Sequence, residues 1–493
     1  MPSSTCTRPY QQHADAPPAA PRPALPERSR PDSLTVVDGR LYLDDLDLVV
    51  TAEKLGSPLY IYSAAQIEAN VRSLRSGFSH SSHITRIFYA AKACGSPAVL
   101  RLMRRLGVDI EVNSGGELQA ALDAGFSPRQ ILFNGVAKTD DELRLAAGLD
   151  IAAVVIDSLW ELQRLAHIAA ELHRRVGVSL RLDVGVAPKT HPGLVTSGDA
   201  KAGIAMADAF AAFSQAAAEP SLKLLGVHFH VGSQVTSTEP HRLAVRTALD
   251  FLDRAEEACG VRVRHIDIGG GFAIPYTDMP LNGSHPWFRS SLTPADYADA
   301  VFAELRGRRD DVQLFIEPGR YLVGNAAVLL SRVVSRKSKL QVSAGGNGAS
   351  PSGADHEGSA ADQRRSSAEH ELRAEDGTGL EEPTYTHWLF VDAGFNTLLN
   401  AVCYDWYYHS IAADRATEPH GAEFRLAGPL CDGGDVHPGE PGRRGRLLPA
   451  DATVGDPIAF LNTGAYTWDT RSAYNGRFPA RGFLLLDDCL IPM

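Results

Sequence analysis

Eight short runs of apolar, β-forming residues follow one another through the middle of this 493-residue chain. Alanine- and leucine-rich stretches of helical composition separate most of the runs, for example Glu117–Ala124 and Leu159–Arg174. Near-continuous apolar runs are typical of strands that are buried on both faces of a parallel sheet. Eight such strands, with a helix after most of them, form a closed (β/α)8 barrel. The predicted strands are Arg86–Ala91, Asp109–Val112, Ile131–Asn134, Ala153–Asp157, Val178–Val184, Leu224–His230, His265–Ile268 and Gln313–Glu317.

Polar residues of unusual chemistry fall where these runs end. The carboxyl ends of parallel barrel strands meet at one mouth, where barrel enzymes place their active sites. Lys92 stands directly after the first run. A lysine there can act as a Schiff-base nucleophile if its surroundings lower its pKa, because only the neutral amine attacks a carbonyl. Taken alone, a lysine in this position is more often a surface residue.

The rest of the chain divides by composition. Residues 1–33 are rich in Pro, Ala, Ser and Arg, which predicts a disordered tail. Residues 63–325 hold the barrel, and the β-rich residues 326–493 predict a second, all-β domain that the short strands within 34–62 would join. The Gly-, Ser- and charge-rich residues 343–382 predict a disordered insertion in that domain.

Charge and composition exclude several functions. A formal net charge of −11 argues against nucleic-acid binding, which needs a basic face. No apolar run is long enough to span a bilayer, and the N-terminus lacks the apolar core of a secretory signal, so we expect no membrane partner and a cytoplasmic protein. The six cysteines show no pairing or metal-type spacing, which favours free thiols.

Three strand-end motifs suggest an anionic, aromatic cofactor. Gly269-Gly270-Gly271 follows the seventh strand, a recurrent phosphate position in barrels, although a tight turn also explains three glycines. His230 and Ser233 follow the sixth strand, where an imidazole can stack on a ring and a hydroxyl can bind phosphate. His228 and His230 are spaced to ligate zinc, but no third ligand is in reach by sequence, so we predict no metal.

The motif Glu317-Pro318-Gly319-Arg320 closes the eighth strand. A carboxylate beside a pyridine nitrogen favours the protonated ring, which is then a strong electron sink. Arg320 suits a phosphate or a substrate carboxylate. A structural ion pair between Glu317 and Arg320 is the alternative.

Together these motifs resemble the fold-type III, pyridoxal-phosphate-dependent decarboxylases of diaminopimelate, ornithine and arginine, over most of residues 34–489. The matching stretches, in the family's order, are Tyr89–Ala93, Val112–Leu118, Phe133–Thr139, Lys189–Pro192, His230–Gln234, Gly269–Gly271, Glu317–Arg320, Gly428–Asp432 and Gly464–Tyr466. The barrel half looks most like diaminopimelate decarboxylase. The resemblance implies an alanine racemase-like fold, in which a TIM barrel precedes a C-terminal β domain, and a homodimer with shared active sites.

The resemblance also implies residue roles for pyridoxal 5'-phosphate. Lys92 would hold the cofactor covalently, His230 would stack on its ring and Glu317 would face its pyridine nitrogen. Cys431 would reach into the partner subunit's site and help to protonate the product. The phosphate would be held by Ser233, Gly269, Gly270, Gly271, Gly319, Arg320 and Tyr466.

The substrate is where this chain departs from diaminopimelate decarboxylase. Asn400 stands where that enzyme has an arginine for the distal carboxylate of its substrate, although Arg471 could restore the cation from another direction. The pairs Tyr404-Asp405 and Cys431-Asp432 look more like those that bracket a distal ammonium in ornithine-type enzymes. Buried carboxylates need a cation, and a substrate ammonium would supply one. Arg320 and Tyr466 are further candidates for substrate contact.

We therefore expect decarboxylation at the Cα of a basic amino acid, ornithine- or lysine-like or a derivative, with diaminopimelate as the alternative. A racemase on the same barrel would also use a lysine and this cofactor, but Cys431-Asp432-Gly433 favours decarboxylation. An inactive binding homologue would be expected to lack the lysine or the cysteine, and both are present.

Overall fold

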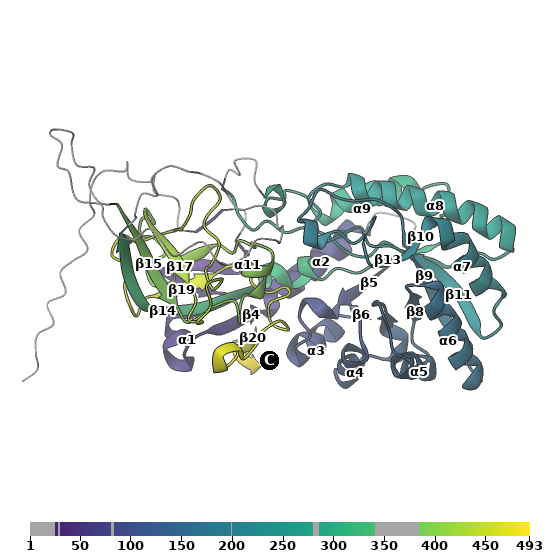
Figure 1. Cartoon of the computed structure of the whole chain (residues 1–493), viewed down its shortest axis with the longest axis horizontal. Helices are drawn as coiled ribbons and strands as arrows, with labels where there is room; N and C mark the ends of the chain where they lie inside the picture. Colours follow the sequence, from purple (N-terminus) through teal and green to yellow (C-terminus); the bar gives the residue numbers. More distant parts are fainter. Residues whose placement is uncertain (1–24, 28–29, 80–82, 199, 280–284, 341–383) are drawn as a thin grey trace, which may run out of the picture.

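The computed structural model describes residues 25–27, 30–79, 83–198, 200–279, 285–340 and 384–493. In Figure 1 the chain forms two parts, with a barrel on the right and a β domain on the left. The tail predicted for residues 1–33 lies largely outside the described residues, and the insertion predicted for 343–382 lies entirely outside them.

Eight parallel strands close the barrel. Each strand pairs with the next in chain order, and β13 pairs with β5 to complete the ring, in the register Leu314↔Thr85. The fold class predicted from the sequence, a (β/α)8 barrel followed by a β domain, is therefore confirmed. The barrel strands are β5 (Thr85–Ala90), β6 (Asp109–Val112), β7 (Ile131–Phe133), β8 (Ala153–Ile156), β9 (Val176–Asp183), β11 (Leu222–His228), β12 (His265–Asp267) and β13 (Gln313–Ile316).

A helix follows each barrel strand. Side chains of the preceding loops cap several of them: Ser114 accepts from the amide of Glu117, and Thr139 forms a capping box with Glu142. Such caps stabilise a helix by roughly 0.5–2 kcal/mol and fix where each loop ends. The helices are α2 (Ala64–Gly77), which precedes β5, then α3 (Pro97–Arg105), α4 (Gly115–Asp123), α5 (Asp140–Leu149), α6 (Leu159–Glu171), α7 (Met206–Ala218), α8 (Glu239–Cys259), α9 (Pro294–Leu305) and the short α10 (Arg320–Val323).

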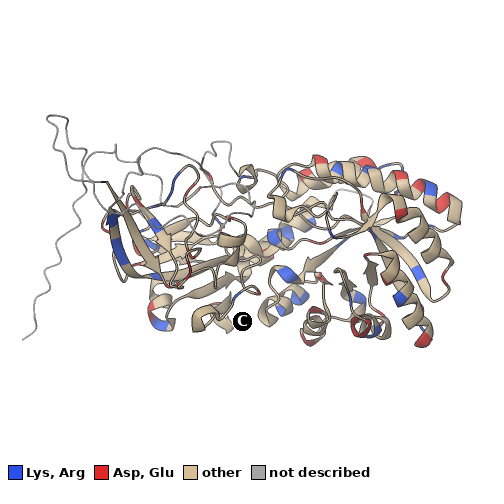
Figure 2. Ribbon diagram, in the orientation of Figure 1, with Lys and Arg blue, Asp and Glu red and all other residues tan. Residues whose placement is uncertain are grey.

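The outer helices carry charges of both signs, as Figure 2 shows along α8 and α9. Arg242 and Arg246 of α8 both bond Glu304 of α9, so these charges cross-link neighbouring helices. None of the helices in the described part of the chain is long and apolar enough to cross a membrane.

The second domain is a twisted β structure built mainly from the C-terminal third of the chain. Its main sheet has the order β18-β17-β15-β14-β4-β20-β21, with β19 on β14 and β16 on β19. The strands are β14 (Ala327–Leu340), β15 (Tyr385–Val391), β16 (Ser410–Ala412), β17 (Ala422–Ala427), β18 (Arg446–Leu448), β19 (Pro457–Phe460), β20 (Arg481–Leu486) and β21 (Cys489–Pro492), and one short helix, α11 (Leu399–Cys403), lies between β15 and β16.

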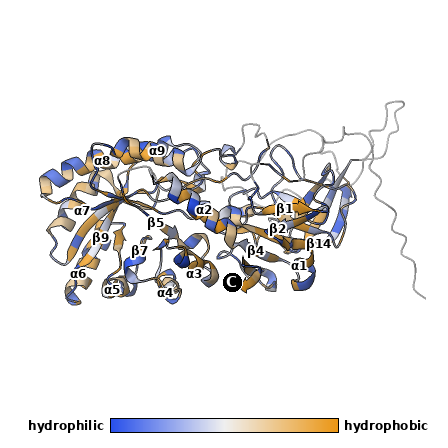
Figure 3. Ribbon diagram, turned by 180° about the vertical axis from the view of Figure 1, so that it is seen from behind, coloured by the Kyte–Doolittle hydropathy of each residue, from blue (hydrophilic) through white to orange (hydrophobic). Residues whose placement is uncertain are grey.

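Residues before the barrel complete this domain. Strand β4 (Leu59–Ser63) lies between β14 and β20 and pairs with both. A separate sheet of β1 (Leu34–Val37), β2 (Arg40–Leu43) and β3 (Leu46–Asp47), followed by α1 (Leu48–Leu55), packs its apolar side chains into the same core. Figure 3 shows hydrophobic residues concentrated around β1, β2 and β4. The chain therefore enters the β domain, leaves it to form the barrel and returns.

Candidate active site

Lys92 stands at the barrel mouth on a single 3-10 turn, Ala91–Ala93, that directly follows β5. Its Nζ lies 3.5 Å from Asn113 Oδ1 and 3.6 Å from Glu111 Oε1, both of the neighbouring strand β6 and its loop. Glu117 fixes Asn113 by accepting from its backbone amide at 2.7 Å. Asn113, one of the two groups that contact the lysine, is thus itself fixed by a hydrogen bond.

The charged groups around Lys92 shift the pKa of its ammonium. Burial alone would lower the pKa of the Lys92 ammonium, but Glu111, Tyr466 and Glu317 outweigh it and raise that pKa above its ordinary value. The lowered pKa that would favour attack by the neutral amine is not found in the protein alone, because acids gather around the amine.

Glu111 is fully buried, with 0% of its side chain exposed. Neither carboxylate oxygen has a hydrogen-bond partner within 3.5 Å among the described residues. Burial raises the pKa of Glu111 to about 7, although Lys92 opposes the rise. The Glu111 carboxyl therefore changes charge near neutral pH, next to the amine.

Behind the lysine, three ionisable groups from three strands meet at the base of the mouth. The potential ligand atoms of His228, Asp267 and Glu317 all lie within 4.8 Å of one another, and His228 Nε2 is 3.2 Å from Glu317 Oε2. Burial raises the pKa of Asp267 well above its usual range, and it also raises the pKa of Glu317, where Lys92 and Arg181 oppose the shift. Two adjacent buried carboxyls do not both ionise, so we infer that Asp267 holds the proton and Glu317 stays a carboxylate.

This set also bears on the metal question. The pair expected to be the candidate ligands was His228 with His230, whereas the structure brings His228 together with Asp267 and Glu317. The absence of a metal stays a prediction.

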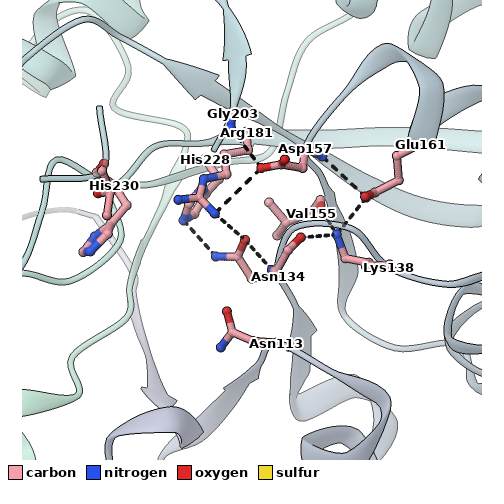
Figure 4. Close-up of polar contacts among 12 residues, drawn as sticks. Asn113, Asn134, Lys138, Val155, Asp157, Glu161, Arg181, Gly203, His228 and His230 are labelled. Atoms are coloured by element: carbon pink, nitrogen blue, oxygen red, sulfur yellow. Dashed lines mark hydrogen bonds and ion pairs between the residues drawn. The ribbon is translucent and has the colours of Figure 1, made fainter. Parts of the chain in front are cut away.

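A hydrogen-bond network supports the base of the mouth, as Figure 4 shows. Asn134 donates from Nδ2 to both Glu317 oxygens at 3.4 Å, and its Oδ1 lies 3.5 Å from Arg181 Nη1. Arg181 lies 3.8 Å from Asp157. The buried Lys138 donates to Glu161 and to the carbonyls of residues 135 and 155, all at 2.7 Å. This network connects the ends of β7, β8 and β9 and fixes the orientation of Glu317.

His230 and the glycine loop lie on the adjoining side of the mouth. His230 Nδ1 accepts from the Gly270 amide at 3.2 Å. Burial, with Lys92 and Arg181 nearby, holds the pKa of His230 well below its usual value, so the ring is neutral. A neutral imidazole can lie against an aromatic cofactor without adding charge.

The glycine loop fits closely against its neighbours. At Gly270 a Cβ would lie 2.3 Å from the Glu317 carbonyl oxygen, and at Gly271, with φ of +94°, it would lie 2.4 Å from another carbonyl. The amides of Gly269 and Gly270 already donate to Asp267 and His230. Of the three expected amide donors, only that of Gly271 is left for a phosphate in the part of the chain that the structure describes.

Arg320 supplies the cation of the expected phosphate site. Its Nε and Nη2 both lie 3.2 Å from Ser233 Oγ, and its Nη1 donates to Tyr276 Oη at 2.7 Å. The guanidinium also lies 4.7 Å from the ring centre of Trp406 and 4.9 Å from that of Tyr466. Gly319, directly before it, lies close to the Tyr466 hydroxyl. Arg320 makes no ion pair with Glu317 among the described residues, so the alternative of a structural pair is wrong.

The residues expected to contact the far end of the substrate lie on a more open rim. Asp405, which is 66% exposed, lies 3.4 Å from His285 Nε2. The ring of Tyr404 meets that of His191 edge to face, with ring centres 5.4 Å apart. Asn400 is buried and donates to the Tyr466 carbonyl at 3.1 Å, so its amide supports the domain rather than the rim.

Cys431 and Asp432 form a separate exposed loop of the β domain. The Cys431 amide donates to Asn475 Oδ1, and Tyr474 Oη donates to Asp432 at 3.3 Å. The five cysteines of the described residues are all free.

Arg471 does not replace the missing arginine. Its Nε and Nη1 donate to the carbonyls of Trp468 and Ala480, and its guanidinium stacks on the Trp468 ring. The possibility that Arg471 supplies a cation from another direction is therefore wrong, because this side chain is held by its own loop.

Sequence reasoning left the supporting residues without roles. His228 was weighed only as a possible zinc ligand with His230, Glu111 and Asn134 counted only among the polar residues at strand ends, and Asp267 was not singled out. A signal was present, because Asp267 is a charged residue within an apolar strand, and a buried charge requires a partner.

These features define a class of protein. The site offers an amine at a barrel mouth, a carboxylate deep beneath it, a neutral imidazole, and an arginine with a glycine loop for an anion. Pyridoxal phosphate has a reactive aldehyde, a pyridine nitrogen and a phosphate, so the residues present fit that cofactor.

Comparison with known proteins also indicates a pyridoxal-phosphate enzyme. Residues 64–324 match the model of the family described as pyridoxal-dependent decarboxylase, pyridoxal binding domain. Diaminopimelate decarboxylase of Pseudomonas fluorescens is 33% identical over 450 residues, which are 90% of this chain and 92% of that one. The same enzyme of Methanothermobacter thermautotrophicus is 33% identical over 89% of each chain.

Among solved structures, diaminopimelate decarboxylase of M. jannaschii in complex with L-lysine superposes with a TM-score of 0.76, at 28% identity over 94% of both chains. The lysine/ornithine decarboxylase of Vibrio vulnificus shares the fold, with a TM-score of 0.67 at 20% identity over 89% of this chain and 97% of that one. The chain belongs to the fold-type III pyridoxal-dependent decarboxylase family and is most similar to its diaminopimelate decarboxylases. It is a pyridoxal-phosphate-dependent carboxy-lyase that acts on an amino acid.

Proposed function

We propose that the protein decarboxylates meso-diaminopimelate to L-lysine. The observation that carries this proposal is the 33% identity with diaminopimelate decarboxylases over about nine tenths of both chains. It favours the alternative substrate of the sequence analysis over the basic amino acid that we placed first. The lysine/ornithine decarboxylase of Vibrio vulnificus, by contrast, shares the fold at 20% identity.

Each residue at the mouth has a proposed role. When bound, pyridoxal phosphate supplies an electron sink for the pair of electrons left on the substrate's Cα as carbon dioxide departs. Lys92 would hold the cofactor covalently, and Glu317 would hold a proton on the pyridine nitrogen. His230 would lie flat on the ring. The phosphate would lie among Ser233, Gly269, Gly270, Gly271, Gly319, Arg320 and Tyr466.

The rim would bind the substrate and complete the proton transfer. Tyr404 and Asp405 would contact its distal end, with Arg320 and Tyr466 nearer the reacting carbon. Cys431 and Asp432 would come from the partner subunit of a homodimer, Cys431 to protonate the product and Asp432 to bind the distal end. The exposure of the Cys431 loop in a single chain supports a role in a second subunit's site. We place this reaction in the cytoplasm.

A second candidate substrate is a basic amino acid such as ornithine or lysine. It is favoured by Asn400 at the arginine position and by the exposed carboxylate of Asp405, which suits a substrate ammonium.

Release of carbon dioxide from meso-diaminopimelate, L-lysine and L-ornithine, measured side by side on the holoenzyme, tests the proposal. We expect kcat/KM for meso-diaminopimelate to exceed the other two by at least about 10²-fold, since a mismatched polar end is penalised strongly. A preference for lysine or ornithine would establish the second candidate instead.

Mixing two inactive variants tests the shared site. Lys92→Ala and Cys431→Ala chains, each inactive as homodimers, should regain activity when mixed, because a mixed dimer holds one intact site. If mixing restores nothing while a mixed dimer forms, Cys431 does not act across the interface.

A further inference from the structure

Two residues far apart in the sequence meet at the rim of the barrel mouth. His285 Nε2 lies 3.4 Å from Asp405 Oδ2, and the two side chains are 36% and 66% exposed. Both residues have positive φ, +58° and +45°, which non-glycine residues adopt only when the surrounding structure holds them there. The pair is therefore accessible and also held in place by its loops.

Aromatic side chains fix this pair from both loops. The His285 ring stacks on Phe288 at 5.7 Å and meets Trp287 edge to face at 5.1 Å. The Phe288 ring in turn meets the ring of Trp406 edge to face, with ring centres 4.9 Å apart. Trp406 directly follows Asp405 in the chain. The loop after β12 and the loop after α11 are thus packed together behind the two polar groups.

The pair lies beside the cofactor site rather than on a remote surface. Trp406 lies against the guanidinium of Arg320, the proposed phosphate ligand. On the other side, the Trp287 ring contacts His191, at a ring distance of 5.6 Å. The loop of His191 is bonded to the mouth, since Thr190 donates to the Ser233 carbonyl at 2.8 Å.

The charges of the pair match a particular substrate end. A carboxylate alone suits an ammonium, whereas an arginine suits a carboxylate. Here a carboxylate and an imidazole lie side by side, and no arginine forms an ion pair with Asp405 within the described residues. In its protonated form the imidazole has two N–H groups, one for Asp405 and one for an incoming carboxylate. A group with one ammonium and one carboxylate, the free end of an α-amino acid, is complementary to such a pair.

We propose that His285 is a specificity-determining residue, which pairs with Asp405 to bind the distal amino-acid end of the substrate. Asp405 takes the ammonium and His285 takes the carboxylate that an arginine would otherwise bind. This inference rests on the proposed function, since meso-diaminopimelate keeps an intact amino-acid end away from the reacting carbon.

Two product-like ligands separate the roles of the pair. Both ligands have an ammonium at one end; at the other end L-lysine keeps an ammonium and a carboxylate, whereas cadaverine has only an ammonium. Their dissociation constants on the holoenzyme are measured by titration calorimetry, with the cofactor absorbance as a check that the site is intact. His285→Ala should raise the dissociation constant of L-lysine by about tenfold or more, because one charged hydrogen bond is lost. The dissociation constant of cadaverine should stay within twofold.

The matched variants sharpen this result. Asp405→Asn should weaken both ligands, and His285→Arg should restore L-lysine binding, since a donor returns. His167→Ala, an exposed histidine on α6, should change neither. Equal weakening of both ligands by His285→Ala, or no weakening of either, would overturn the proposal.

Failure of the proposed function has a different signature. A higher kcat/KM for L-lysine than for meso-diaminopimelate in the unmodified enzyme would refute diaminopimelate as the substrate, whichever ligand His285→Ala affects.

Discussion

The cofactor side of the site and its substrate rim are built differently. On the cofactor side, Glu317, Asn134 and Arg181 come from three strands, are buried and bond one another. On the rim, Asp405 and Asp432 lie on exposed loops and bond mainly to nearby loop residues. A single chain completes the first region, whereas the second is left open on one side.

This difference indicates which property each region can change. A buried network of charges tolerates few substitutions. Removing one partner leaves the other unpaired in a low-dielectric interior, which is strongly destabilising. An exposed pair on loops can be altered at small cost in stability. We therefore expect changes in the buried region to affect cofactor and folding, and changes on the rim to affect the choice of substrate.

The largest effect is expected at Lys92. Lys92→Ala should lower carbon dioxide release by roughly 10⁴-fold or more and abolish the covalent attachment of the cofactor, because the nucleophile is gone. Borohydride reduction of the holoenzyme followed by peptide mapping measures the attachment directly. A label on another lysine would show that Lys92 is not the residue that attaches the cofactor.

The next effect concerns the pH dependence of folding. With a folded-state pKa of about 7, Glu111 binds its proton more tightly in the folded than in the unfolded chain. The stability of the cofactor-free protein should therefore fall as pH rises from about 4.5 to 7, by about 3 kcal/mol at most.

Glu111→Gln should remove that fall, which thermal unfolding at a series of pH values measures. The exposed Glu53→Gln is the matched control and should leave the slope unchanged. An unaltered slope in Glu111→Gln would mean that Glu111 is ionised throughout this range.

A smaller effect is expected at Arg320. Arg320→Lys keeps the charge but loses the fork that reaches Ser233 and Tyr276 together, so cofactor affinity should fall about ten- to a hundredfold. Equilibrium dialysis of the cofactor measures it. The ratio of kcat/KM values for competing substrates should stay unchanged. A changed ratio would contradict the assignment of substrate choice to the rim alone.

The smallest change in stability is expected at Asp432. Asp432→Asn should alter the free energy of unfolding by less than about 0.5 kcal/mol, because the Asp432 carboxylate is exposed. If that carboxylate contacts the substrate in the partner subunit's site, the same substitution should raise KM about tenfold. Denaturant unfolding and steady-state kinetics on one preparation measure both. An unchanged KM would place Asp432 outside the site.

Sequence patterns were sufficient to locate the strands of the barrel. All eight barrel strands occur within a few residues of their predicted ranges, since apolar runs bounded by polar loops specify strands locally. The two-residue strand β3 and the three-residue strands β16 and β18 of the β domain were not predicted, because such short segments carry no periodic signal.

By itself, the sequence determined the barrel and the cofactor class, and it predicted the chemically active residues, because motifs at strand ends place their side chains at one mouth whatever the remaining packing. Only the tertiary structure decided the charge states of Glu111 and Asp267, the local bonding of Arg471 and the meeting of His285 with Asp405. These depend on burial and on contacts between distant segments, and such energies are set by the folded environment and not by the residues that precede or follow in the chain.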